Sequence, residues 1–136
     1  MSGRSGYSDD CERVDLYRQA VENAIRGRRG QAFIREAISA LDALPEPSLI
    51  ADDLTDGRGG YCLLGAVGRA RGVGDRKLRA LSDDRPGYVA QELGFDIADS
   101  LAAELVNEND GEHWGPETDA ERFARVHRWL NGMVKS

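Results

Sequence analysis

Apolar residues recur at every third or fourth position through long stretches of this chain, and this spacing predicts helices rather than strands. In the clearest stretch, residues 31–44, one apolar stripe runs along the segment, and Pro45 and Pro47 then end the helix. Val, Ile and Thr, which favour strands, are sparse, whereas Ala and Leu are plentiful. The sequence therefore predicts an all-α fold.

The chain has the length of one domain, so we predict a loose arm over residues 1–7 and one compact helical domain over 8–136. The segment 61–70 is apolar nearly all round, which predicts a buried central helix. Gly65 and Gly68 weaken a helix, so we expect a neighbouring backbone to pack closely against them. The five or six expected helices cover residues 8–27, 31–44, 61–70, 88–93, 96–107 and 118–134.

Charges are segregated along the chain. The segment 86–121 contains ten carboxylates and no Lys or Arg, whereas 69–85 contains six cations. The net charge of −6 disfavours binding to nucleic-acid phosphates or to anionic membranes, because both require a positive surface. We therefore predict a non-catalytic acidic interaction protein whose partner is a basic protein, with no direct contact to nucleic acid.

The predicted partner-binding surface centres on the helix over 96–107, whose apolar residues share one face while its carboxylates occupy the other. Trp114 follows in a loop, and an exposed Trp in such a loop can anchor a partner. The competing interpretation is that the charge only keeps the protein in solution. The predicted surface comprises Asp96, Asp99, Glu104, Glu108, Asp110, Glu112 and Trp114.

The two cysteines, Cys11 and Cys62, are too few for a disulfide framework, so we expect reduced thiols. Cys62 opens a helix, where the helix dipole favours a thiolate. The alternative function is therefore a small cysteine-dependent hydrolase or transferase, with Cys62 as nucleophile, His113 as base and Asn109 as orienting group. No strand follows Cys62 to hold the histidine, and its apolar neighbours are typical of a core residue. The favoured interpretation is a protein without catalytic activity.

No segment carries the ligands of a metal or cofactor site. The oxygen-rich segment 107–113 fails as a calcium loop, because the register set by Gly111 places Val106 at the first ligand position. A transition-metal site needs clustered His or Cys, and the chain has only 2 His and 2 Cys. The glycine-rich segment 57–60 leads into a helix but lacks the Lys-Ser/Thr ending of a phosphate-binding loop. We predict no metal and no cofactor.

The N-terminal ten residues contain no apolar segment of a signal peptide. No run approaches the roughly 18 apolar residues that a membrane span requires. We therefore predict a cytoplasmic protein that does not contact a membrane. A homodimer is left open, in which the basic stretch 69–85 of one copy would pair with the acidic segment of the other.

The segment Tyr61-Cys62-Leu63-Leu64-Gly65-Ala66, the later Asn109-Asp110 and the capped final helix resemble a family of short uncharacterised bacterial and phage proteins. The resemblance covers residues 12–134, and the chain departs from the pattern because no aromatic residue directly precedes Asn109. No activity is assigned to that family, so the resemblance implies a phage or mobile-element context rather than a reaction. By analogy, it implies an inhibitor that binds a nucleic-acid-binding host defence protein and imitates the charge of nucleic acid.

Overall fold

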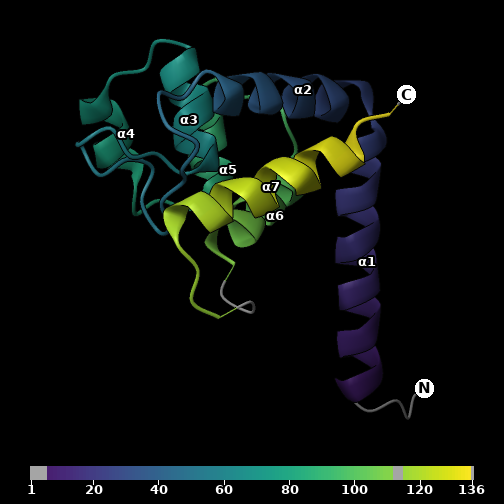
Figure 1. Cartoon of the computed structure of the whole chain (residues 1–136). Coiled ribbons are helices and arrows are strands. Elements are labelled where there is room, and N and C mark those ends of the chain that lie inside the picture. Colours follow the sequence, from purple (N-terminus) through teal and green to yellow (C-terminus); the bar gives the residue numbers. More distant parts are fainter. Residues whose placement is uncertain (1–5, 112–114, 136) are drawn as a thin grey trace.

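The computed structural model describes residues 6–111 and 115–135, and these residues form seven helices and no strand (Figure 1). The predicted all-α class is confirmed. Residues 1–5 of the predicted arm lie outside the described residues, and the first helix begins at Gly6 rather than Ser8. The helices are α1 (Gly6–Arg26), α2 (Arg28–Asp42), α3 (Leu63–Ala70), α4 (Asp75–Leu81), α5 (Pro86–Glu92), α6 (Asp99–Asp110) and α7 (Asp119–Met133).

Helix α4 is the element that the sequence pattern did not assign, and it accounts for seven helices where five or six were predicted. Asp75 in its first turn suits the positive end of the helix dipole. Leu78 and Leu81 lie one turn apart and are both buried. Seven residues give a weak periodic signal, so this helix depends on burying those two leucines against the rest of the fold.

The core is drawn mainly from α2, α3, α6 and α7, and α2 packs against α3 while α5 packs against α6. In α3 every residue from Leu63 to Gly68 is buried. A Cβ at Gly65 would lie 1.8 Å from the carbonyl oxygen of Leu54. The close neighbour expected at Gly65 is therefore the backbone of the loop that precedes α3, not a crossing helix.

Interactions within a few residues explain where α7 begins and where α6 ends. Thr118 accepts a hydrogen bond from the Glu121 amide (3.1 Å), and the Glu121 carboxylate accepts one from the Thr118 amide (2.8 Å), so α7 starts with a capping box. Helix α6 begins at Asp99 rather than at the predicted residue 96, and it runs on to Asp110 before Gly111 ends it at φ 59°. Residues 107–110, expected to lie partly in a loop, are therefore helical.

Helix α1 stands apart from the other helices over its N-terminal part (Figure 1). Its C-terminal part contacts α2 and α6. Val14, Leu16 and Tyr17 remain 56%, 67% and 42% exposed, respectively, whereas Val21 is buried. The helix therefore joins the core only near its C-terminal end.

Candidate functional site

A cavity of about 170 Å³ lies where four segments meet: the loop before α3, the first turn of α3, the connection between α4 and α5, and the end of α6. Its floor is apolar, and most of the floor side chains are buried. Its exposed edge carries four carboxylates, which we call the acidic rim, and no Lys, Arg or His among the described residues lines it. The floor consists of Leu54, Leu63, Leu64, Pro86, Val89 and Val106, and the acidic rim consists of Asp52, Asp53, Asp84 and Asp110.

Asn109 holds three of these segments together. It is 1% exposed, and its Oδ1 accepts a hydrogen bond from the Leu63 amide at 2.9 Å, in the first turn of α3. Its Nδ2 donates to the Ile50 carbonyl at 3.0 Å and to the Asp110 carboxylate at 3.2 Å. The same Asp110 oxygen accepts a hydrogen bond from the Asp52 amide at 3.1 Å. The Asn109-Asp110 pair therefore fixes the loop, α3 and α6 around the cavity.

Cys62 is the N-cap of α3, and its Sγ accepts a hydrogen bond from the Gly65 amide at 3.4 Å. Burial raises the pKa of the thiol from 9.0 to about 12, which outweighs the lowering effect of the helix amides. The thiol is therefore neutral near pH 7. His113 lies outside the described residues, and His127 pairs with Asp42 at 2.8 Å. Asn109 is engaged in structural hydrogen bonds, so this geometry gives no support to a Cys62 nucleophile.

Two arginines of α7 form ion pairs with three of the ten carboxylates in the segment 86–121. Arg125 contacts the Glu108 carboxylate at 2.9 Å and the Glu117 carboxylate at 2.7 Å, and these three side chains are only 12–16% exposed. The hydrogen bond from Arg125 lowers the pKa of Glu117. Arg125 also donates to the carbonyls of Glu108 (2.6 Å) and Asn109 (3.3 Å). Glu108, which the sequence assigns to the partner surface, is therefore neutralised inside the fold.

Arg122 is 8% exposed and binds the same region. It contacts Glu117 at 3.5 Å and Asp119 at 3.1 Å, and it donates to the Leu49 carbonyl at 3.2 Å. Both Arg122 and Arg125 fall outside the apolar stripe of α7, a pattern that by itself predicts solvent exposure. Their burial shows that the α7 arginines hold α6 and the loops onto the core.

The remaining residues of the predicted partner surface have different surroundings. Asp96 is exposed and pairs with Arg29 at 2.8 Å. Glu104 is half-buried and accepts a hydrogen bond from the Tyr17 hydroxyl at 3.4 Å. Asp99 is exposed, and its carboxylate lies over Gly87 in the first turn of α5, next to Pro86 of the cavity floor. Glu112 and Trp114 lie outside the described residues.

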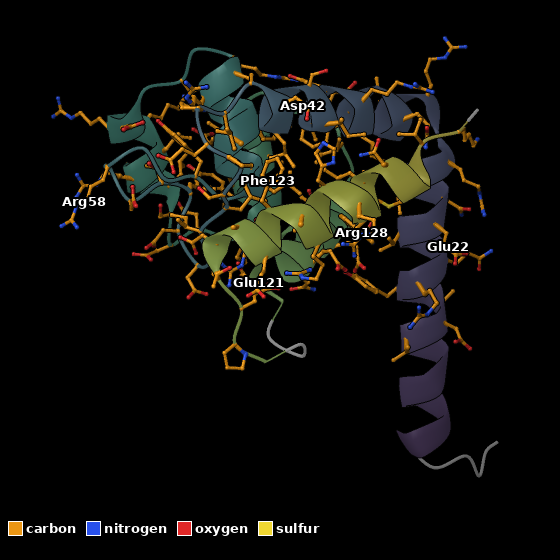
Figure 2. The ribbon with its side chains drawn as sticks, in the orientation of Figure 1. Glu22, Asp42, Arg58, Glu121, Phe123 and Arg128 are labelled. Atoms are coloured by element: carbon orange, nitrogen blue, oxygen red, sulfur yellow. The ribbon has the colours of Figure 1, made fainter. Side chains whose placement is uncertain are left out.

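The glycine-rich loop before α3 is held by hydrogen bonds between its own residues. One oxygen of Asp56 accepts hydrogen bonds from the Arg58 amide (2.7 Å) and the Gly60 amide (3.0 Å), and these amides lower the pKa of Asp56. The Gly57 amide donates to the Thr55 hydroxyl at 3.1 Å. Arg58 projects outward from the tip of this loop (Figure 2). Three of the four amides of the segment 57–60 that could have held a phosphate are therefore occupied.

The sequence did not indicate that the four carboxylates of the acidic rim would lie together. Asp52 and Asp53 precede the glycine-rich segment 57–60, and Asp84 belongs to a turn about 30 residues later in the chain. Their only sequence signal was a group of acidic residues next to Gly and Pro. Within the described residues, no group of three or more His, Cys, Asp or Glu side chains is placed to hold a metal ion.

Comparisons with family models, with curated proteins and with solved structures give no match to this chain. Among the described residues, no helix is both long enough and apolar enough to cross a membrane.

Proposed function

We propose that the protein is a non-catalytic interaction protein that binds a basic partner protein through the acidic rim. The observation that supports this function is the cavity itself, which combines a rim of four carboxylates with an apolar floor. Arg58 and Arg79 share a second pocket with Asp53, but none of the four rim carboxylates forms an ion pair within 4.0 Å with a described residue. Such carboxylates favour a positive ligand and repel an anionic one. The rim therefore replaces most of the acidic segment as the proposed binding surface.

The apolar floor sets the chemistry of the side chain that enters. An Arg or Lys side chain has an aliphatic stem that buries on apolar surface while its charged end stays at a polar edge. In this cavity the stem would lie against Leu54 and Val89, and the charged end would meet Asp52 and Asp84. Arginine matches this best, because its planar guanidinium binds carboxylates through two parallel hydrogen bonds.

Asp99 extends the proposed surface beyond the cavity, because it lies beside Gly87 and is exposed. Asp96 is left out because it pairs with Arg29 and lies in a separate groove that Arg28 and Arg71 also line. Glu108 is left out because Arg125 neutralises it. We further propose that α3, whose residues 63–68 are all buried, is the central helix that supports the cavity.

The setting that we propose is the cytoplasm of a host cell, with the protein acting as an inhibitor from a phage or mobile element. The partner would be a host defence protein that binds nucleic acid, because such proteins present rows of Arg and Lys for phosphates. The rim carboxylates would occupy those side chains in place of phosphates.

The test measures binding of a fluorescein-labelled nona-arginine peptide by fluorescence anisotropy at low salt and at physiological salt. We expect Asp52→Asn/Asp84→Asn to weaken binding about fivefold to tenfold, because two rim charges are lost. The matched control, Glu46→Gln/Glu92→Gln, removes the same charge from exposed sites elsewhere and should change binding less than about twofold. Physiological salt should weaken wild-type binding, since screening acts over about 8–10 Å.

A third variant, Asp99→Lys/Glu104→Lys, tests the surface predicted from the sequence. Because Asp99 borders the cavity, this variant should weaken binding as well. Equal losses in the rim variant and in the matched control would show attraction to net charge alone and would overturn the proposal. Unchanged binding of the rim variant would do the same.

A further inference from the structure

Helix α1 carries an apolar stripe that continues past the body of the molecule. Near its C-terminal end, Val21 is buried and Ile25 packs against the core. One turn and two turns earlier, Tyr17 and Val14 continue the same stripe but are 42% and 56% exposed. An exposed apolar stripe that continues a buried one indicates a surface that another element covers.

The exposed part of the stripe forms one wall of a groove of about 250 Å³. The opposite wall comes from Glu104 of α6 and from Trp129 and Met133 of α7. The groove is therefore apolar along its base, with polar groups at its edges. Its length follows α1, so a helix fits it better than a small molecule does.

One side of the groove carries two side chains of opposite charge. Arg18 and Glu22 lie four residues apart on the same flank of the stripe and both line the groove. Glu22 extends from α1 into solvent (Figure 2). Neither side chain forms an ion pair within 4.0 Å with a residue in the ranges 14–111 and 115–135. The flank therefore offers one positive and one negative group to a partner.

We propose that the groove is occupied by α1 of a second copy of this chain, packed antiparallel about a two-fold axis. In such a pair, residues on the same flank meet in reverse order, so Arg18 of each copy lies opposite Glu22 of the other. The Val14 and Tyr17 side chains of each copy then fill the groove of its neighbour. Self-complementarity of this kind selects a second copy over an unrelated helix.

This dimer is independent of the proposed partner site, because α1 contributes no residue to the cavity or to its acidic rim. The test uses sedimentation-velocity ultracentrifugation of the full chain. We expect the wild type to dimerise, and we expect Arg18→Glu and Glu22→Arg each to weaken the dimer about tenfold, since each creates two like-charge contacts.

The decisive sample is an equimolar mixture of the two single variants. In the mixed dimer the side chain at position 18 of each copy would again face an opposite charge at position 22 of the other, so the mixture should dimerise about as well as the wild type. Charge effects within one helix cannot produce this rescue, because each chain keeps its own like-charge pair. A monomeric wild type at about 100 µM, where contacts of micromolar affinity persist, would overturn the proposal, and so would a mixture no better than its components. Val14→Asp provides a second probe and should abolish the dimer while circular dichroism shows unchanged helix content.

Discussion

Replacing Asn109 by Ala should lower the free energy of unfolding by about 3–5 kcal/mol. Asn109 is 1% exposed and satisfies two buried backbone groups, the Leu63 amide at 2.9 Å and the Ile50 carbonyl at 3.0 Å. Each group left without a partner costs about 1–3 kcal/mol. The missing side-chain volume adds a cavity cost, and water entering from the neighbouring cavity offsets part of the total.

The measurement is urea unfolding followed by circular dichroism, with Asn107→Ala as the control. Asn107 lies on the same helix but is exposed, so its loss should change stability by less than about 0.5 kcal/mol. Asn109→Leu keeps the volume without the polar groups and should be as destabilising as the Ala variant. A loss below about 1 kcal/mol for Asn109→Ala, with an unchanged denaturant slope, would refute the structural role derived for this residue.

Three further predictions concern stability. Gly65→Ala should cost about 1–3 kcal/mol or more by thermal unfolding, because its Cβ would lie 1.8 Å from the Leu54 carbonyl oxygen. The wild type should lose stability as the pH rises from about 9 toward 12, by at most about 1.4 kcal/mol per pH unit, because the unfolded Cys62 thiol loses its proton first; Cys62→Ala should lack this contribution. Arg125→Ala should cost roughly 2–4 kcal/mol in urea unfolding, because two nearly buried carboxylates lose their partner.

Each of these predictions has a matched control. Gly132→Ala adds the same methyl group to α7 with nothing within 4 Å, and it should stabilise by up to about 1 kcal/mol; equal behaviour of the two glycines would contradict the close approach at Gly65. Identical pH slopes for wild type and Cys62→Ala would show an accessible thiol. Arg128→Ala removes an exposed arginine one turn from Arg125, so equal losses would show that the ion pairs contribute nothing.

The sequence by itself determined the helical class, the approximate limits of most helices and the cap of the final helix. These depend on interactions within a few residues: the apolar spacing of 31–44, the prolines after it and the reciprocal hydrogen bonds of Thr118 and Glu121. Short helices were harder to predict, because α4 is stabilised by burying Leu78 and Leu81 rather than by its own propensity. The buried state of Cys62 also followed from its apolar neighbours.

Only the tertiary structure decided which charges remain available. The sequence shows ten carboxylates in 86–121 without a cation among them, yet Arg125 reaches back from α7 to neutralise Glu108 and Glu117. The acidic rim likewise combines Asp52 with Asp84 and Asp110, which lie far apart in the chain. Charge interactions act through space and depend on burial, so the same carboxylate can hold a core together or face a partner. Packing alone determines which of these a given side chain does.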